Sequence, residues 1–470
     1  MVRKKVTALR FAGALLLLST GSARSQTAFV PLTQMGSQTY LGFPGGLYEN
    51  GTNGPPSDHA AAGAARSALV QPLDTSGNPS AAGKIVLLSI GMSNTTQEFC
   101  SGGGLPPCDS WTFVGQALTD AAVNHSTLLL INGARGGQSA ATWDSATDTN
   151  YDRVRDTDLA NAGATEKQVQ AAWVKVANPG PTISLPSVSS DAYTLETQMG
   201  NIVRAMKTRY ANLRLVYFSS RIYAGYATTT LNPEPYAYES GFAVKWLVQA
   251  QIDQMRNAGI VVDSRAGDLN YTTGAPWIAW GPYLWANGTT PRSDGLAWLQ
   301  ADLQSDGTHP SQSGQRKVGT QLLFFFKTAP TTRVWFLAGC SSGAACGSFY
   351  TLAPCRLIDT RNPTGPYGGP ALAAGVSRSF VLTGQCGIPT TATAVSLNVV
   401  SITPSTGPAF LTGFPGGLPL PLVSTVNSGA GQIRANNAVV ALGGGGDVQV
   451  FCGQGAGTSH LVVDVNGYFQ

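Results

Sequence analysis

The middle of the chain alternates between short continuous apolar runs and longer segments with helical spacing. Uninterrupted runs of this length are typical of strands buried on both faces, and they cover residues 85–90, 127–131, 213–218 and 260–262. Apolar residues recur at helical spacing in four other segments, 111–123, 166–176, 194–210 and 239–257. This alternation predicts an α/β domain with a parallel sheet over residues 84–327. Because ligands of such sheets bind at the carboxyl ends of the strands, chemistry is expected where each run ends.

The pattern changes from about residue 348. Short alternating runs separated by Gly, Pro, Asn and Ser replace the helical spacing, as at 394–400, 438–442 and 461–465. They predict an all-β, sandwich-like module over 348–470, joined by a linker at 328–347. At the other end, residues 26–83 are rich in Gly, Pro, Ser and Ala. We expect them to form an irregular N-terminal arm that packs on the α/β domain.

The first 25 residues have the layout of a secretory signal peptide. Four basic residues among the first ten precede an apolar run at 11–18, and small residues lead to Ser25. The run is too short to span a bilayer, and no later run approaches the length of about 20 apolar residues that a spanning helix needs. We therefore expect a cleaved signal peptide over 1–25, a secreted or periplasmic localisation and no integral membrane segment in the mature chain.

Composition limits the kind of partner. Charged residues make up 11% of the 470 residues, less than half of the usual share of about 25%. The formal net charge is +4, but five basic residues lie within 1–25, so the mature chain would carry −1. These values exclude a coiled coil, a highly charged disordered protein and a nucleic-acid binder that depends on a strongly basic surface. We expect no nucleic-acid partner, and the low charge favours neutral polymers.

Seven cysteines are consistent with an oxidising compartment. Their short spacings favour local disulfides, which would pair Cys100 with Cys108, Cys340 with Cys346 and Cys355 with Cys386, leaving Cys452 over. No pair has the spacing of a zinc site with neighbouring histidines. A structural metal site is therefore not expected.

A serine follows the first predicted strand directly. In the sequence Gly-Met-Ser-Asn at 91–94, Ser93 can lie on a tight turn with its hydroxyl exposed above the sheet. Gly-x-Ser is common, and position 95 is Thr rather than the second Gly of a nucleophile elbow. An ordinary strand-to-helix turn with a capping serine would have the same sequence.

The segment Asp-Gly-Thr-His-Pro at 306–310 offers Ser93 its partners. His309 is the one histidine with a carboxylate three residues upstream on a Gly-containing turn. Asp306 could accept the Nδ1 proton of His309 and leave Nε2 free to take the serine proton. The alternative is that His309 and Pro310 merely open a helix.

The second predicted strand runs into a glycine-rich turn at 132–138. Glycine lets a backbone N–H approach a reacting carbonyl closely, although any tight turn would look alike. Together, the segments 91–94, 132–138 and 306–310 resemble the first, second and last motif blocks of the SGNH (GDSL-like) hydrolases. They are most similar to the carbohydrate-esterase branches of that superfamily, and the resemblance covers about residues 84–327.

This resemblance implies a flavodoxin-like three-layer α/β/α fold and ester hydrolysis without a cofactor. By position, Ser93 is the nucleophile, His309 the base and Asp306 the residue that orients it. The backbone N–H groups of Ser93 and Gly137 would bind the oxyanion, with Gly136 the alternative to Gly137. Asn94 and Gln138, which flank these groups, are candidates for substrate contact.

One departure from the family pattern concerns the third block, Gly-x-Asn-Asp, whose Asn donates to the oxyanion. The segment 218–225, after the strand predicted at 213–218, contains no Asn. Ser220 or Arg221 could substitute, or the oxyanion hole could have two donors. For Arg221, a role in a surface or interface salt bridge is the alternative.

Aromatic residues crowd the stretch before Asp306. Trp277, Trp280 and Trp285 could stack on sugar rings, or on acyl or aryl groups, near a strand-end cleft. They could equally pack a long loop over the sheet.

The C-terminal region resembles a β-sandwich module appended to many exported bacterial proteins, through 354–361 at its start and 463–469 at its end. Arg356, Asp359 and Arg361 could form a buried ion network or contact a ligand, and the structural role is favoured. Binding of glycan or cell envelope by this module is one possibility.

The leading hypothesis is a secreted serine esterase. Its substrate would be a carbohydrate that carries O-acyl groups, foremost O-acetyl groups, or another small ester. The alternatives are a catalytically silent glycan- or envelope-binding protein and a lipolytic esterase of the same fold.

Overall fold

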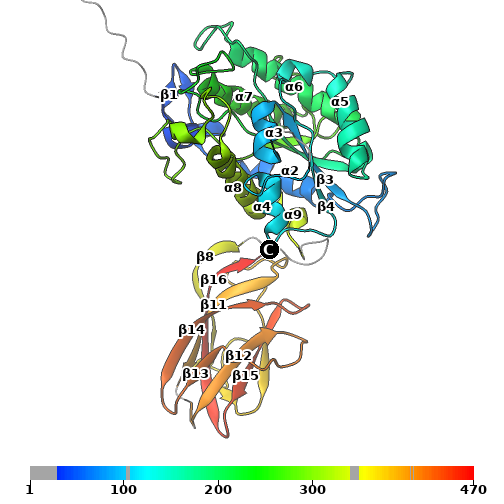
Figure 1. The fold of residues 1–470 in the computed structure, drawn as a ribbon. Helices are drawn as coiled ribbons and strands as arrows, with labels where there is room; N and C mark the ends of the chain where they lie inside the picture. Colours follow the sequence, from blue (N-terminus) through cyan, green and yellow to red (C-terminus); the bar gives the residue numbers. More distant parts are fainter. Residues whose placement is uncertain (1–28, 102–105, 339–348, 403, 406, 470) are drawn as a thin grey trace, which may run out of the picture.

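The protein is described by a computed structural model that covers residues 29–101, 106–338, 349–402, 404–405 and 407–469. Two parts of the chain are distinct in Figure 1, a helix-rich α/β part and a C-terminal part made of strands. The expected signal peptide and the expected pair Cys340–Cys346 lie outside the described residues. Within them, no helix is long and apolar enough to cross a membrane.

A five-stranded parallel sheet organises the first part. Its strands are β3 (Ile85–Gly91), β4 (Leu128–Asn132), β5 (Val169–Lys175), β6 (Leu215–Phe218) and β7 (Trp277–Trp280). They pair in the order β4-β3-β5-β6-β7, and every pairing is parallel. Numbered along the chain, this order is 2-1-3-4-5, so the strand order reverses beside β3. A crevice at the carboxyl ends of β3 and β5 is therefore the expected ligand position.

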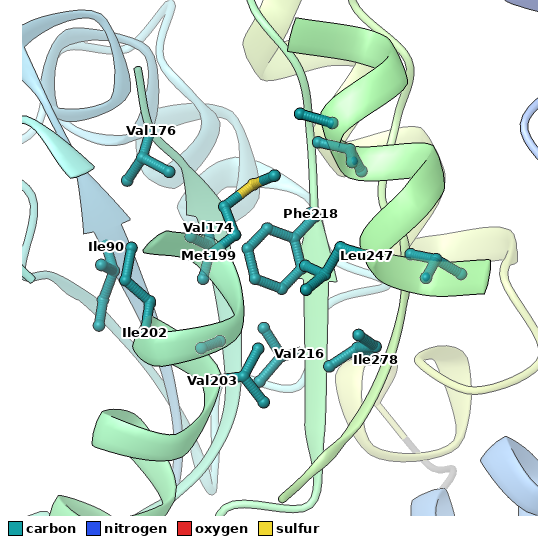
Figure 2. Packing of buried hydrophobic residues seen from close by; sticks show 14 of the residues in the cluster. Ile90, Val174, Val176, Met199, Ile202, Val203, Val216, Phe218, Leu247 and Ile278 are labelled. Atoms are coloured by element: carbon teal, nitrogen blue, oxygen red, sulfur yellow. The ribbon is translucent and has the colours of Figure 1, made fainter. Parts of the chain in front are cut away.

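Both faces of this sheet are buried, because successive strand residues belong to different hydrophobic clusters. Val86 and Leu88 pack in one cluster, and Ile85 and Leu87 in the other. Figure 2 shows the first cluster, in which Ile90, Val174 and Val216 of the sheet meet Met199, Ile202 and Leu247 of the helices. These helices are α6 (Asp191–Arg209) and α7 (Tyr236–Arg256). The second cluster includes residues of α4 (Phe113–Thr119), α8 (Gln312–Thr328) and α9 (Arg333–Phe336).

Two of the predicted elements in this domain are wrong. The segment 166–176, predicted as a helix, consists of one 3₁₀ turn at 166–168 followed by strand β5. The segment 260–262, predicted as a strand, is an exposed loop after α7. Ile260 is 64% exposed, whereas every residue of β5 is buried. The fifth strand is instead β7, within the aromatic stretch. The domain also continues past residue 327, because Trp335 and Phe336 of α9 are buried in its core, inside the predicted linker.

The N-terminal arm packs on the α/β domain but is more regular than predicted. It contains α1 (Leu32–Met35), β1 (Thr39–Tyr40), β2 (Phe43–Pro44), η1 (Glu49–Gly51) and α2 (Ser57–Ser67). Leu32 and Tyr40 are buried in the same cluster as α7. The remaining short helical elements are α3 (Ser93–Phe99), η2 (Ala140–Thr142), α5 (Thr149–Arg153), η3 (Val154–Leu159), η4 (Glu166–Gln168) and η5 (Gln300–Asp302).

The C-terminal part consists of two antiparallel sheets. One has the order β10-β15-β12-β13, with strands Ser377–Val381, Asp447–Gly453, Ala409–Pro415 and Val426–Ser428. The other has the order β14-β11-β16-β8, with strands Ile433–Ala441, Ala394–Ile402, Thr458–Phe469 and Phe349–Asp359, and the short β9 (Leu372–Ala373) pairs with β16. Side chains of both sheets share one hydrophobic cluster. The predicted strands at 394–400, 438–442 and 461–465 fall within β11, β14 and β16.

The described cysteines follow the predicted pairing. Disulfides join Cys100 to Cys108 and Cys355 to Cys386, and Cys452 is free and buried. In the β module, Arg361 pairs with Asp359 at 2.6 Å and Arg356 with Asp464 at 2.8 Å. Both arginine side chains are about half exposed and Asp359 is buried, so this network lies at the surface around one buried carboxylate.

Candidate active site

Three predicted residues form a continuous hydrogen-bonded chain at the carboxyl edge of the sheet. Nε2 of His309 lies 2.8 Å from Oγ of Ser93, and its Nδ1 lies 2.5 Å from Oδ2 of Asp306. With Nδ1 protonated and donating to Asp306, Nε2 can accept the serine proton. This is the geometry that nucleophilic catalysis by serine requires.

Close packing at Gly91 holds Ser93 above the sheet. Strand β3 ends at Gly91, and Ser93, two residues later, is the first residue of α3. A Cβ at Gly91 would lie 2.2 Å from the carbonyl oxygen of Lys175, so no larger residue fits there. The Thr95 hydroxyl donates to that same carbonyl at 2.6 Å. The turn thereby ties Ser93 to the carboxyl end of the neighbouring strand β5.

The loop that carries Asp306 and His309 is held by its own carboxylate. Oδ1 of Asp306 accepts hydrogen bonds from the backbone N–H groups of Thr308 at 2.9 Å and His309 at 3.0 Å. Burial alone would raise the pKa of the Asp306 carboxyl, but the hydrogen bonds from the His309 ring and the two N–H groups outweigh it and lower that pKa. Asn94 donates to the carbonyl of Thr308 at 3.0 Å. Asn94 thus links the serine segment to the histidine loop.

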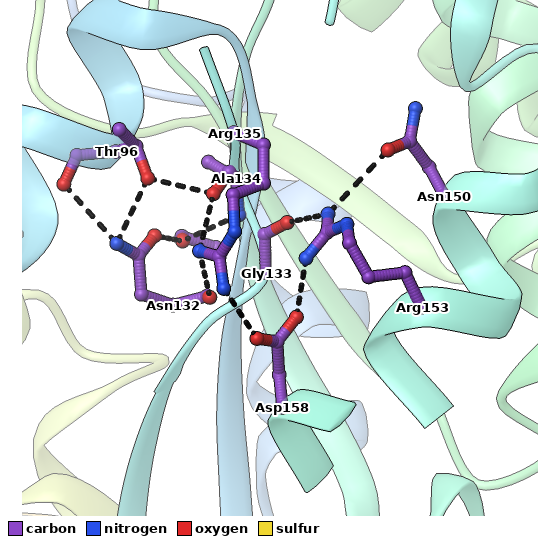
Figure 3. A network of polar contacts seen from close by, with 9 residues as sticks. Thr96, Asn132, Gly133, Ala134, Arg135, Asn150, Arg153 and Asp158 are labelled. Atoms are coloured by element: carbon purple, nitrogen blue, oxygen red, sulfur yellow. Dashed lines mark hydrogen bonds and ion pairs between the residues drawn. The ribbon is translucent and has the colours of Figure 1, made fainter. Parts of the chain in front are cut away.

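A polar network supports the glycine-rich turn after β4 (Figure 3). Asn132 accepts from the Ser89 hydroxyl at 2.6 Å and donates to Thr96 of α3, whose hydroxyl donates to the carbonyl of Ala134. On the other side, Asp158 pairs with Arg135 at 2.6 Å and with Arg153 at 2.5 Å. The turn is therefore tied both to the helix that begins with Ser93 and to the segment 153–158.

The two glycines of this turn lie beside Ser93. A Cβ at Gly136 would lie 3.9 Å from the Cβ of Ser93, and Gly137 lines the same cavity as Ser93. Gly137 has φ +78°, a conformation that favours glycine. Both glycines are exposed. The structure therefore brings the predicted oxyanion donors next to the predicted nucleophile.

Asn178 is a cavity residue that the sequence patterns did not predict. The third strand of the sheet is β5, and Asn178 follows it by three residues and lines the cavity that contains Ser93 and Gly137. Its amide donates to Gln198 at 2.6 Å, and its carbonyl accepts from Asn232 at 3.3 Å. Because β5 is the third strand along the chain, the segment that follows the third strand is the one with Asn178 rather than 218–225. Recognising β5 as a strand would have found it.

The cavity at this edge has a volume of about 260 Å³. Asn94, Arg221, Thr308 and the triad residues Ser93 and His309 are among its lining residues. Its other lining residues are Met92, Gly137, Ser139, Ala177, Asn178, Pro179, Leu231 and Asn232.

Two predicted substrate contacts are not on this wall. Gln138 accepts a hydrogen bond from Asn150 at 2.7 Å, and Ser220 is 1% exposed beneath the surface. Neither lines the cavity, whereas Asn94 and Arg221 do.

The prediction that tryptophans form a platform for sugar rings is wrong. Trp277, Trp280 and Trp285 are between 0 and 3% exposed, because β7 and the segment after it lie in the core. Two of the indole N–H groups donate to the N-terminal arm, from Trp277 to the His59 carbonyl at 3.0 Å and from Trp280 to the Leu47 carbonyl at 2.8 Å. These side chains fasten the arm to the sheet and are closed to a sugar.

A fully buried ion pair joins the carboxyl end of β5 to α3. Nζ of Lys175, the last residue of β5, lies 2.5 Å from both carboxylate oxygens of Glu98 on α3, and both side chains are 0% exposed. Burial lowers the pKa of Lys175 and raises that of Glu98. The pair connects the strand that leads to Asn178 with the helix that begins at Ser93.

Among known proteins, no family model and no curated sequence matches this chain. Several solved structures are similar in part. A two-domain esterase active on acetylated mannans, crystallised with mannopentaose, is 11% identical with a TM-score of 0.28, over 88% of this chain and 95% of that one. An extracellular lipase from Streptomyces rimosus is 14% identical with a TM-score of 0.26, over 52% of this chain and 99% of that one.

A third similar structure is a carbohydrate esterase family 2 enzyme with a carbohydrate-binding domain, from Corynascus thermopiles (Myceliophthora fergusii). It is 13% identical with a TM-score of 0.29, over 53% of this chain and 68% of that one. Likenesses at these scores carry no argument of their own. The case for a catalytic site rests on the hydrogen-bonded chain of Ser93, His309 and Asp306.

Proposed function

We propose that this protein is a secreted serine esterase that hydrolyses O-acyl, foremost O-acetyl, esters on a carbohydrate. The observation that carries the proposal is the chain of hydrogen bonds from Ser93 through His309 to Asp306. Polar side chains on the cavity wall, among them Asn178 and Asn232, suit a hydroxylated substrate. The resemblance of the motif segments to carbohydrate esterases and the two disulfides also support it.

In the proposed reaction, Oγ of Ser93 attacks the acyl carbonyl while Nε2 of His309 takes the serine proton. The carbonyl oxygen becomes an oxyanion, which would accept hydrogen bonds from the N–H groups of Ser93 and Gly137 and from the Asn178 amide. His309 then returns its proton to the departing sugar oxygen and leaves an acyl-serine. Water activated by His309 releases the acid, and Asp306 stabilises the imidazolium in both halves.

Replacement of the nucleophile tests this proposal. Ser93→Ala should reduce acetate release from acetylated polysaccharides by at least about 10⁴-fold, since the acyl-enzyme route is lost. Ser110→Ala, an exposed serine of the same domain, is the matched control and should keep full activity. A fluorophosphonate probe should label the native protein and the control but not Ser93→Ala. Equal turnover by Ser93→Ala would refute the proposal.

A lipolytic esterase is the second candidate, because Met92, Ala177 and Leu231 give part of the cavity wall an apolar character. A series of esters of increasing acyl length separates the two. The deacetylase proposal expects the highest kcat/KM for acetyl, and a maximum at long chains would favour the lipase. A catalytically silent binding protein would show no Ser93-dependent labelling at all.

A further inference from the structure

The glycine turn beside Ser93 is a tight turn with two glycines in its middle. The N–H of Gln138 donates to the carbonyl of Arg135 at 3.3 Å, so these two are the corner residues and Gly136 and Gly137 lie between them. The φ of +78° at Gly137 suits the third position of a turn that requires glycine there. Glycine is the most flexible residue, so the position of the Gly137 N–H depends on how the corner residues are held.

One helical stretch holds both corner residues. Arg135 pairs with Oδ1 of Asp158 at 2.6 Å, and the side-chain oxygen of Gln138 accepts from the Asn150 amide at 2.7 Å. Between these two contacts, Arg153 pairs with Oδ2 of Asp158 at 2.5 Å, and its Nη2 lies 3.5 Å from Oδ1 of Asn150. Asn150 and Asp158 are each 7% exposed. We refer to Asn150, Arg153 and Asp158 as the clamp.

The clamp also holds the backbone that leads into the turn (Figure 3). Nη2 of Arg153 donates to the carbonyl of Gly133 at 2.6 Å, and Nη1 of Arg135 donates to that of Ala134 at 3.0 Å. Hydrogen bonds from a charged donor are roughly twice as strong as those between neutral groups. The single carboxylate of Asp158 binds both guanidinium groups. Its loss would therefore loosen two successive carbonyls and one corner of the turn together.

A π-helical turn makes this arrangement possible. Asp158 lies five residues after Arg153, and in an α-helix of 3.6 residues per turn two such side chains would be about 140° apart around the axis. The segment Val154–Leu159 is a π-helix, in which hydrogen bonds connect residues five apart and bring them to the same side. Such turns within helices are frequent at functional sites. The wider turn thus lets Asp158 reach Arg153 and Arg135 together.

Other charged residues of the same stretch behave differently. Arg155 pairs with Asp152 at 2.9 Å and with Asp156 at 2.6 Å, and these three side chains are between 43 and 60% exposed. Exposed pairs of this kind contribute little to stability. The side chain of Asp158 is 3% exposed, and its partners extend toward the glycine turn. The exposed pairs therefore provide matched controls for the clamp.

We propose that Asp158 is a positioning residue for the oxyanion hole. Through Arg135 and Arg153 it holds the turn so that the N–H of Gly137 is in place for the oxygen of the tetrahedral intermediate. Donors that are already in place stabilise a developing oxyanion without reorganising during the reaction. Asp158 does not line the cavity and acts only through these partners. The inference rests on the proposed esterase function and extends it to a residue outside the cavity wall.

Asp158→Asn tests the positioning role. The amide has one oxygen for two guanidinium groups, so the turn should loosen while the fold survives. For an aryl acetate, kcat should fall by about 10–100-fold with KM within about twofold of the native value, as expected when a group that acts in the transition state is misplaced. Counting enzyme by fluorophosphonate labelling of Ser93 restricts kcat to folded molecules. Asp156→Asn, which changes an exposed carboxylate of the same segment, should keep the native kcat.

Two readouts separate positioning from a purely structural role. A trifluoromethyl ketone adds reversibly to Ser93 and forms a tetrahedral oxyanion, so its Ki should rise by the factor by which kcat falls. The midpoint of the pH profile of kcat/KM should stay native, because His309 and Asp306 are untouched. A lower urea midpoint with native kcat and Ki would mean a structural role and overturn the inference. A displaced pH midpoint would assign Asp158 to the histidine and also overturn it.

Arg153→Met keeps the inference testable if Asp158→Asn does not fold. It removes the donor to the Gly133 carbonyl from a side chain that is 26% exposed, and kcat should fall by about tenfold with KM unchanged. Arg155→Met, whose side chain is 46% exposed, is the matched control and should keep the native kcat. A native kcat in Arg153→Met would overturn the inference.

The native protein distinguishes this inference from the function on which it rests. Ser93-dependent hydrolysis of the aryl acetate, together with a native kcat in the clamp variants, would leave the esterase proposal standing and remove the role of Asp158. Absence of any Ser93-dependent hydrolysis would remove both.

Discussion

The α/β domain and the β module differ in how many charged side chains they bury. Glu98, Lys175 and Arg221 are at most 1% exposed and gather at the carboxyl edge of the parallel sheet. In the described part of the β module, Asp359 is the one buried charged side chain, and its partner Arg361 is about half exposed. Burying a charge costs several kcal/mol per ion unless it is well paired. The α/β domain therefore buries charged side chains in several places, of which this edge is one, whereas the described part of the β module buries a single carboxylate.

This contrast also qualifies the inference from composition. A chain with 11% charged residues and a mature net charge of −1 favours neutral partners on average. A cavity is governed by the few charges that line it, and Arg221 lies there without a close carboxylate among the described residues. The charges that line the cavity, rather than the average charge of the chain, therefore govern which ligands the cavity favours.

The largest expected effect is on kcat, and it compares Asp306, which binds His309, with Asp359, which binds Arg361. Asp306→Asn should lower kcat by about 10⁴-fold, because an amide cannot hold His309 in the tautomer that accepts the serine proton. The Asn side-chain oxygen can still accept from the N–H groups of Thr308 and His309, so the fold should survive. Steady-state acetate release measures the effect.

Asp359→Asn in the β module is the matched control for that variant and should leave kcat within about twofold of the native value. A comparable loss of activity in Asp359→Asn would mean that the module takes part in catalysis, and the contrast between the domains would fail.

The next comparison is between the contributions of two ion pairs, Lys175–Glu98 and Arg356–Asp464, to the free energy of unfolding. Lys175→Met leaves Glu98 buried without its partner, which should cost about 3–5 kcal/mol of unfolding free energy. Arg356→Met breaks the half-exposed pair with Asp464 and should cost less than about 1 kcal/mol. All nine tryptophans lie before residue 336, so tryptophan fluorescence in urea follows the α/β domain alone.

Arg356→Met should leave that fluorescence transition unchanged, and its small effect should appear only in the circular dichroism of the strands. Equal costs for the two variants would contradict the distinction between buried and surface pairs.

A third comparison uses the two edges of the parallel sheet. Asn178→Ala, at the carboxyl edge, should lower kcat by about 10²–10³-fold with little change in KM, as the loss of one oxyanion donor does. Asn212→Ala, which precedes β6 at the amino edge and donates to the Lys167 carbonyl, should keep native kinetics. Loss of binding without loss of kcat in Asn178→Ala would assign this residue to the substrate rather than to the oxyanion.

Asn178 also shows where sequence patterns stop being informative. The motif segments around Ser93 and His309 could be recognised because their spacing within a short turn is itself the geometry of the site. Strand β5 could not, because its polar residues are satisfied by distant partners. Gln170 exchanges hydrogen bonds with the backbone of Gln71, and Lys175 pairs with Glu98. Without those tertiary contacts, polar residues among apolar ones indicate a helix.

The aromatic stretch shows the opposite error, because a segment predicted as a loop contains the strand β7. Glycine and proline at 274, 276, 281 and 282 surround β7 and are typical of loops. The strand is nevertheless central to packing, because Trp277 and Trp280 lie between the sheet and the N-terminal arm. Turn residues determine where a strand ends but not whether the short run between them is buried.

The smallest expected effect contrasts the two domains through pH. Burial, with a contribution from Asp263, raises the pKa of Glu196 on α6 from 4.5 to about 8, and this side chain is 1% exposed. When the Glu196 carboxyl is still protonated in the folded state but already ionised in the unfolded state, the free energy of unfolding is lower. The α/β domain should therefore lose stability as the pH rises from about 4.5 to about 8, and the penalty is constant above that range. Glu196→Gln should remove about 2 kcal/mol of this loss at pH 9 and change little at pH 4, measured by tryptophan fluorescence in urea.

The β module should respond with the opposite sign. The hydrogen bond from Arg361 lowers the pKa of Asp359 from 3.8 to about 2, so its contribution is present above pH 3.8 and is lost as the pH falls toward 2. Asp359→Asn should thus weaken the module at pH 7 and matter little at pH 2, by circular dichroism of the strands. If Glu196→Gln had the same effect at pH 4 and pH 9, the buried carboxyl would act through packing alone, and the pH contrast between the domains would not hold.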